Sequence, residues 1–119
     1  MPYVDGFVVP VPRENIDAYR NMAITAGKIW REHGALQFRE CVGDDVKPGQ
    51  VTSFPQSVNL KDGEVVFFSW IVYESRAKRD EVNEKVMTDP RMKDFMEMKN
   101  APFDGKRMIY GGFEVLVDL

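Results

Sequence analysis

Residues 64–74 read Glu-Val-Val-Phe-Phe-Ser-Trp-Ile-Val-Tyr-Glu, and this stretch decides the fold. β-branched and aromatic residues fill it, it contains no Gly or Pro, and it is too short for a buried helix, so it predicts a central β-strand. Side chains alternate along a strand: one face carries Val65, Phe67, Ser69, Ile71 and Tyr73, and the other carries Val66, Phe68, Trp70 and Val72. Both faces are apolar. We therefore expect helices to cover one face and a second copy of the chain to cover the other.

The size and charge of the chain limit its class. Its 119 residues suffice for one core, so we expect a single domain spanning residues 1–119. The 19 carboxylates outnumber the 16 Lys and Arg residues, and the basic residues are scattered, which argues against a nucleic-acid partner. No apolar run approaches the roughly 20 residues of a membrane span, and the N-terminus does not read as a signal peptide. With a single cysteine, Cys41, these features favour a cytoplasmic protein.

Strand and helix patterns alternate along the chain. The expected elements are a strand Tyr3–Val9 stopped by Pro10 and Pro12, a helix ending at Gly34, an edge strand Ala35–Val42, the central strand, a helix capped by Ser75 and ending at Asp89-Pro90, a short helix Pro90–Lys99 and a last strand Arg107–Val117. This order predicts an α+β, ferredoxin-like βαββαβ fold, with one antiparallel four-stranded sheet and helices on one face.

Two further segments carry structural signals. The long connection between Gly43 and Gly63 contains Val51, Phe54 and Val58, so we expect it to pack on something, and in a dimer to reach across to the partner. The pair Gly111-Gly112 inside the last strand indicates a bulge or a close approach of another segment.

Six motifs spread over nearly the whole chain are distinctive. They are Tyr3-Val4-Asp5-Gly6-Phe7-Val8, Trp30-Arg31-Glu32-His33-Gly34-Ala35, Phe68-Ser69-Trp70-Ile71, Ser75-Arg76-Ala77 with Arg79-Asp80, Asp89-Pro90-Arg91-Met92, and Phe103-Asp104-Gly105-Lys106-Arg107-Met108-Ile109-Tyr110-Gly111-Gly112-Phe113. These motifs resemble the YbaA-like family, small bacterial proteins without an assigned function. That family is similar to dimeric α+β barrel proteins, in which two ferredoxin-like sheets close into a shared barrel, so the resemblance implies a homodimer. It implies no catalytic residues, and the enzymes and haem proteins that use such barrels are related only at the level of fold.

Asp5 is the acid most relevant to function. It lies in the middle of a strand that this fold makes interior, where a carboxylate must be paired, protonated or in contact with a wet cavity. It is either the acid or base of a pocket or a structural partner of Arg39 or Arg107. The candidate ligand-binding residues are Asp5, Trp30, Arg39, Tyr73, Arg107 and Tyr110. The candidates for a catalytic role are Asp5, His33, Tyr73 and Tyr110.

Metal and cofactor sites have little support. His33 is the only histidine, so a histidine-rich cluster is excluded and a haem would have to use this residue. At a helix end, His33 also suits the negative end of the helix dipole. The pair Asp44-Asp45 offers either a carboxylate metal site or a solvated turn. We expect neither a metal nor a cofactor.

Two functions follow as hypotheses. The first is a homodimeric module that binds a small, partly apolar molecule in the barrel or in the cleft between sheet and helices. The alternative is a cofactor-independent enzyme, monooxygenase- or isomerase-like, that uses Asp5 as acid or base. An RNA-recognition sheet is disfavoured, because the first and last strands lack the required basic and aromatic pattern.

Overall fold

The structure is a computed structural model that describes residues 1–96 and 101–119. Its elements are β1 (Tyr3–Pro12), a 3-10 turn η1 (Arg13–Asn15), α1 (Ile16–His33), β2 (Gln37–Val42), α2 (Phe54–Ser57), β3 (Glu64–Tyr73), α3 (Arg76–Met87), α4 (Pro90–Met96) and β4 (Ile109–Glu114). The order of the major elements is the predicted one, and α2 is a single turn added between β2 and β3.

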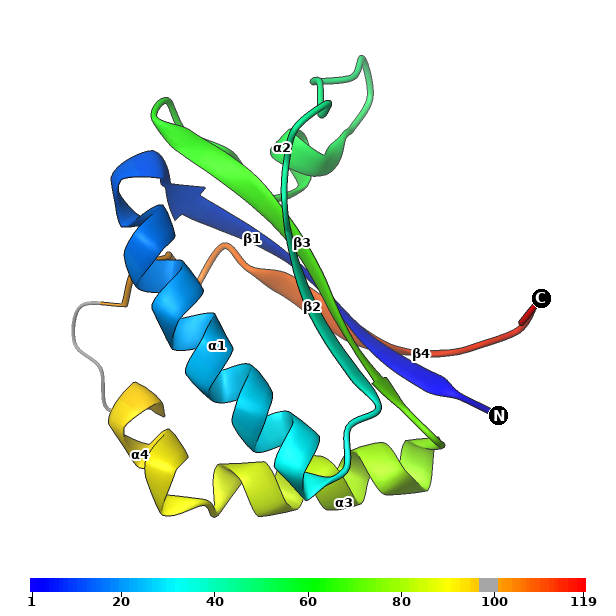
Figure 1. Cartoon of the computed structure of the whole chain (residues 1–119). Coiled ribbons are helices and arrows are strands. Elements are labelled where there is room, and N and C mark those ends of the chain that lie inside the picture. The colour runs from blue at the N-terminus through cyan, green and yellow to red at the C-terminus, as the bar shows by residue number, and fades with distance from the viewer. Residues whose placement is uncertain (97–100) are drawn as a thin grey trace.

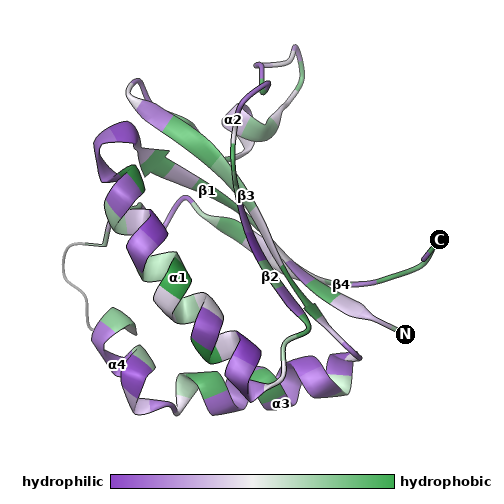
Figure 2. Ribbon diagram, viewed as in Figure 1, coloured by the Kyte–Doolittle hydropathy of each residue, from purple (hydrophilic) through white to green (hydrophobic). Residues whose placement is uncertain are grey.

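One antiparallel sheet with strand order β2-β3-β1-β4 forms the centre of the molecule. Helices α1, α3 and α4 lie on one side of it (Figure 1). The predicted ferredoxin-like α+β fold is confirmed, with the first and third strands interior and the second at an edge. The apolar residues of β3 are green in Figure 2, and the helices carry both colours because each presents one apolar stripe to the sheet.

The predicted bounds of β1, β2 and β4 differ from the structure, and β2 begins at Gln37 rather than Ala35, because its pairing with β3 starts there. β1 continues through Pro10 to Pro12, because its pairing with β4 stops at Val8 and a proline facing the unpaired side removes no ladder hydrogen bond. β4 spans only Ile109–Glu114, and its pairing with β1 is confined to Tyr3–Val8. α4 is described as far as Met96, so the remainder of the predicted helix to Lys99 lies outside the described residues.

The segment between β2 and β3 covers part of the face opposite the main helices. Val58 is fully buried there against Val8 and Val66, which confirms that it packs, whereas Val51 is exposed and its expected packing is wrong. Phe54 meets Phe68 edge to face, with ring centroids 5.7 Å apart. Within one chain this segment already shields the region of Val8 and Val66, and its reach across to a partner stays a prediction.

The core beneath the helices divides into two clusters. One lies around the end of β3 and the helices α3 and α4, and consists of Tyr3, Ile29, Ala35, Ile71, Tyr73, Val82, Val86 and Met92. The other lies at the opposite end of the sheet beneath the start of α1, and consists of Val9, Val11, Tyr19, Ala23, Val65 and Phe67. The space between the two clusters is the candidate site.

Candidate functional site

A cavity of about 530 Å³ lies between the helix-covered face of the sheet and helices α1, α3 and α4. Two rows of residues across the sheet form its base. The strand register gives these rows as Glu40, Ser69, Phe7 and Tyr110, and Phe38, Ile71, Asp5 and Gly112. The helices contribute mostly apolar walls, among them Met22, Ala26, Trp30, Met87, Met92 and Phe95.

Small residues create the space in these two rows. Ser69 interrupts the large side chains of β3 between Phe67 and Ile71, so the sheet is hollowed at that position. At Gly112 a Cβ atom would come within hard contact of both the Arg79 guanidinium and the Tyr3 hydroxyl. The predicted close approach at the glycine pair is therefore confirmed at Gly112, and it lets Arg79 cross β4 to reach the cavity.

The polar end of the cavity is an ion pair. Asp5 is 9% exposed, and its carboxylate lies 3.3 Å from the Arg79 Nε atom. Arg79 also donates to the Tyr3 hydroxyl at 3.1 Å, and its guanidinium lies 4.9 Å from the centroid of that ring. The predicted partners of Asp5, Arg39 and Arg107, are wrong. The actual partner comes from α3, whose first turn the fold places over β1 and β4.

Asn83 organises the neighbouring hydrogen bonds. Its side-chain oxygen accepts from the indole of Trp30 at 3.1 Å and from the hydroxyl of Tyr73 at 3.2 Å. Tyr73 is fully buried and does not line the cavity, whereas Asn83 and Trp30 do. Burial, with the Asp5 carboxylate nearby, raises the pKa of Tyr73, so the phenol acts as a fixed donor.

A second carboxylate, Glu40, faces the cavity from β2. It accepts a hydrogen bond of 2.8 Å from the Tyr19 hydroxyl and lies opposite Ser69 in the strand register. Burial raises the pKa of Glu40, and burial beside Glu40 raises that of Tyr19. Thus the cavity has one carboxylate paired with a cation and one held only by hydroxyl groups.

Two further predicted site residues lie elsewhere or only at the margin. Arg39 is exposed on the edge strand, at the margin of the cavity, and bonds the carbonyl of Phe38. Arg107 does not line the cavity and instead clamps Glu64, with N–O distances of 2.6 and 2.8 Å, and Asp104 at 2.9 Å. Tyr110, by contrast, stacks on Phe7 with ring centroids 6.1 Å apart and lines the cavity as a largely exposed residue.

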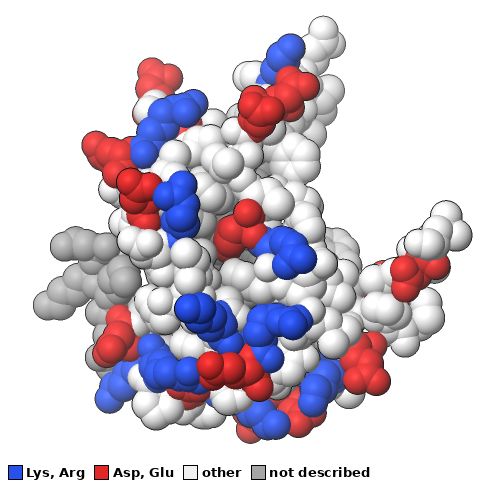
Figure 3. Space-filling model, in the orientation of Figure 1, with Lys and Arg blue, Asp and Glu red and all other residues white. Residues whose placement is uncertain are grey.

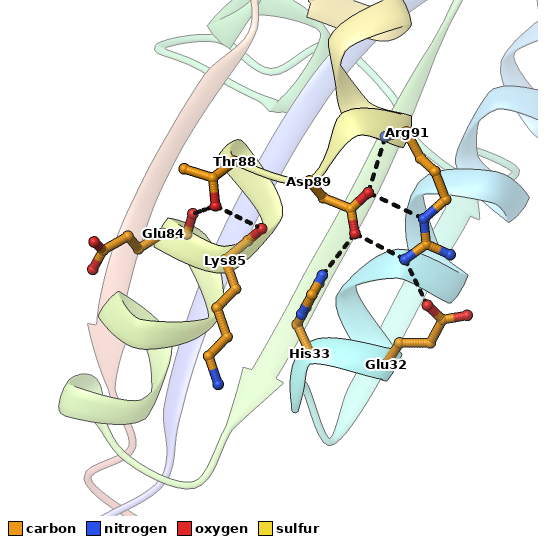
Figure 4. Close-up of polar contacts among 7 residues, drawn as sticks. All are labelled: Glu32, His33, Glu84, Lys85, Thr88, Asp89 and Arg91. Carbon is orange, nitrogen blue, oxygen red and sulfur yellow. Dashed lines mark hydrogen bonds and ion pairs between the residues drawn. The ribbon is translucent and has the colours of Figure 1, made fainter.

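His33 is a helix-end residue, as the dipole argument predicts. Its Nε2 atom lies 2.8 Å from Asp89, which also accepts from Arg91, and Arg91 in turn bonds Glu32 (Figure 4). Hydrogen bonds from Arg91 and then His33 hold the pKa of Asp89 well below its usual range. This network joins α1 to α4 and lies outside the cavity, so His33 is not brought together with Asp5.

The described part of the chain offers no donor set for a metal ion. Among residues 1–96 and 101–119, no three His, Cys, Asp or Glu side chains come together. Asp44 and Asp45 are exposed and thus lack a third ligand of these types there. No described helix has the length and hydropathy needed to cross a bilayer.

Several cavity residues were missed from the sequence. Glu40 alternates with Phe38 on the inward side of β2, so strand parity alone could have identified it. Ser69, the one small residue of the central strand, also marked the position of the cavity. Arg79 and Asn83 gave no such signal, because a helix pattern does not say which strand its polar residues will meet.

The comparisons with known proteins identify the family. Residues 2–105 match the family described as "Protein of unknown function (DUF1428)". The chain belongs to the DUF1428 family. Relatives in Escherichia coli K12 and Shigella flexneri, both described as "Uncharacterized protein YbaA", are 54% identical over 118 residues, which is 99% of each chain. The resemblance predicted from the six motifs is confirmed.

Solved structures resemble this member of the DUF1428 family in fold. A dimeric ferredoxin-like protein from an uncultured marine organism matches with a TM-score of 0.56 and 9% identity, over 100% of both chains. The Mycobacterium tuberculosis protein Rv0793 matches with a TM-score of 0.51 and 14% identity, over 99% of this chain and 98% of that one. At these identities the likeness shows the fold alone.

Proposed function

We propose that the protein is a homodimeric module that binds a small, partly apolar molecule in the cavity between sheet and helices. The observation that carries this proposal is the cavity itself, about 530 Å³ with mostly apolar walls and a few convergent polar groups. That combination of volume and lining is typical of ligand sites. A buried ion pair such as Asp5–Arg79 is expensive to desolvate, which favours a role beyond stability.

The hydrogen bonds indicate the chemistry of the ligand. The oxygen of Asn83 is occupied by Trp30 and Tyr73, while among the described residues its amide nitrogen has no acceptor. Arg79 adds further donors, and Asp5 balances its charge. The polar end therefore offers donors with little net charge. Such a site suits a neutral acceptor, for instance a carbonyl oxygen attached to an aromatic or aliphatic body.

A matched pair of probes tests this proposal. Acetophenone and ethylbenzene have similar shapes, but only the former carries an acceptor. We expect acetophenone to bind more tightly and to shift the NMR signals of the Met92 and Met22 methyl groups, which line the cavity. Asn83→Asp keeps an oxygen for Trp30 and Tyr73 but removes the free donor, so it should abolish the preference for acetophenone.

Control variants separate binding from folding. Asn21→Asp makes the same change on an exposed part of α1 and should bind both probes like the wild type. Circular dichroism should show that both variants are folded. Absence of methyl shifts with either probe, at concentrations near their solubility, would contradict the cavity proposal.

The homodimer is supported by the sheet face opposite the main helices. On this face, Phe68, Ile109 and Phe113 are 43, 44 and 63% exposed. The connection between β2 and β3 covers only one end of the face, where Val58 packs. An apolar patch of this kind is typical of an interaction surface. The marine structural neighbour is described as dimeric, which supports a second copy as the partner.

The cofactor-independent enzyme would use the same cavity. Because Asp5 is held by Arg79, an acid–base role would require proton transfer within an ion pair, so the binding module is the better-supported function. Asp5→Asn separates the two. If turnover of any carbonyl probe is found and is lost in this variant while binding persists, the enzyme is favoured over the module.

A further inference from the structure

A second recess lies beside the cavity. It is a groove of about 890 Å³ between α1 and β2, on the side of the sheet that carries the helices, so the proposed dimer leaves it uncovered. The groove and the cavity share part of one wall, at Tyr19, Ala23, Phe38, Arg39 and Glu40, but most of their lining residues differ.

The floor of this groove is aliphatic. Ile24, Leu36 and Val42 line it and are 49, 54 and 53% exposed. A single exposed aliphatic side chain is ordinary on a protein surface, but three in one recess form a patch that is costly to leave in water. The floor therefore suits an aliphatic chain.

The rim of the groove is basic. Lys28, Arg31 and Arg39 line it, and among the described residues none of the three is paired with a carboxylate. Arg31 bonds the carbonyls of Ala35, at 3.2 Å, and Leu36, and Arg39 bonds that of Phe38 at 3.1 Å. The fourth cation, Arg20, is paired with Asp17.

The two acids of the lining are already engaged. Glu32 accepts from Arg91 at 2.6 Å, and Glu40 accepts from the Tyr19 hydroxyl at 2.8 Å. Figure 3 shows Lys and Arg side chains on this face of the molecule, interspersed with Asp and Glu. The chain as a whole has a net charge of −3, so a locally positive groove is a specific feature rather than a consequence of composition.

We infer that this groove binds an anionic amphiphile, specifically a free aliphatic carboxylate. Its chain would lie on Ile24, Leu36 and Val42, and its head group would meet Lys28, Arg31 and Arg39. A recess of this volume accommodates a single small molecule, whereas a membrane surface or a nucleic acid would require a broader basic surface.

Decanoate and decyltrimethylammonium, used below their micellar concentrations, test the inference by calorimetry. The two probes share a chain and differ in the charge of the head. Decanoate should bind at least tenfold more tightly, and each CH₂ removed, as in octanoate, should weaken binding by up to about fourfold per methylene. Methyl signals of Ile24 and Leu36 should shift, rather than those of Met92 and Met22 in the cavity.

Charge-reversal variants give the matched controls. Lys28→Glu with Arg39→Glu should weaken decanoate binding at least tenfold. Lys47→Glu with Lys61→Glu makes the same change of net charge outside the groove and should leave the affinity within about twofold, apart from weak long-range effects. All four side chains are exposed, so both double variants should fold. Circular dichroism checks this.

Three outcomes would overturn the inference. They are equal binding of the two probes, shifts confined to the cavity methyl groups, and equal loss of affinity in both double variants. Two alternative ligands would also overturn the inference if they bind while decanoate does not. Binding of an acidic extended peptide would assign the groove to strand addition at the edge of β2. Binding of anionic phospholipid vesicles would assign it to a membrane contact. The cavity and the groove are probed through different methyl groups. If decanoate does not bind the groove, the proposed function of the cavity is therefore neither supported nor contradicted.

Discussion

At the scale of single residues, two carboxylates on the same sheet face have opposite environments. Asp5 has an arginine partner, whereas Glu40 is half-buried and is held by hydroxyl groups, with a hydrogen bond of 2.8 Å from Tyr19. The second environment disfavours a negative charge, which is why the pKa of Glu40 is raised. A group whose pKa is higher in the folded than in the unfolded chain contributes stability below its ordinary pKa, and this contribution is lost as the pH rises through the folded value.

Glu40→Gln should therefore have a pH-dependent effect. The amide oxygen still accepts from Tyr19, but the variant has no charge to bury. We expect its free energy of unfolding, relative to the wild type, to increase from pH 4 to pH 7. Urea denaturation at several pH values measures this difference. A variant that is less stable than the wild type at pH 7 but not at pH 4 would contradict the account.

Gly112 and Gly111 form a natural pair of test positions. A Cβ at Gly112 would collide with Arg79 and Tyr3, whereas a Cβ at Gly111 would have its nearest neighbour in Phe113, at an ordinary 3.6 Å. Gly112→Ala should destabilise the protein by about 1 to 3 kcal/mol and weaken acetophenone binding, because Arg79 must move. Gly111→Ala should change both quantities little. Equal effects of the two substitutions would show that the contact with Arg79 is not the cause.

At the scale of elements, α3 contributes two polar residues to the cavity. Arg79 and Asn83 are four residues apart and so lie on one face of the helix. The helix starts at Ser75, whose side chain accepts from the Lys78 amide at 3.1 Å, and the Arg79 amide donates to the Ser75 carbonyl at 2.9 Å. The position of Arg79 therefore depends on the first turn of α3.

Ser75→Ala tests this dependence. Loss of the cap should lower the free energy of unfolding by about 1 kcal/mol and weaken acetophenone binding as the first turn frays. Ser75→Asp supplies another capping oxygen and should restore both quantities. Hydrogen exchange at the amides of Lys78 and Arg79 provides the local measurement. If Ser75→Ala alters stability without changing exchange at these amides, the positioning role is wrong.

At the scale of the whole molecule, the sheet has one face under helices and one face only partly covered. Phe68 lies on the open face, and burial of a side chain of this size contributes roughly 1.5 to 3 kcal/mol. Several such groups in water would promote association. The proposed dimer buries them, and stable interfaces of this kind typically bury about 1,200 to 2,000 Å².

Light scattering after size exclusion tests the dimer. The wild type should remain dimeric at micromolar concentration, and Phe68→Glu should give insoluble protein rather than a clean monomer. Leu36→Glu introduces the same charge on the helix-covered side and should stay soluble and dimeric. A well-behaved wild-type monomer at ordinary salt would contradict both the dimer and the barrel.

The sequence alone determined the major elements and their order, but not the single helical turn α2. Residues 64–74 defined the interior strand, and Gly34 defined the end of α1. Both signals are local, because side chains alternate along any strand and glycine adopts a positive φ at little cost. The same parity placed Asp5 facing inward. The tertiary structure alone decided its partner. Arg79 is 74 positions away along the chain and belongs to a helix with no pattern that marks a strand contact, so only the packing of α3 across β1 and β4 brings the two charges together.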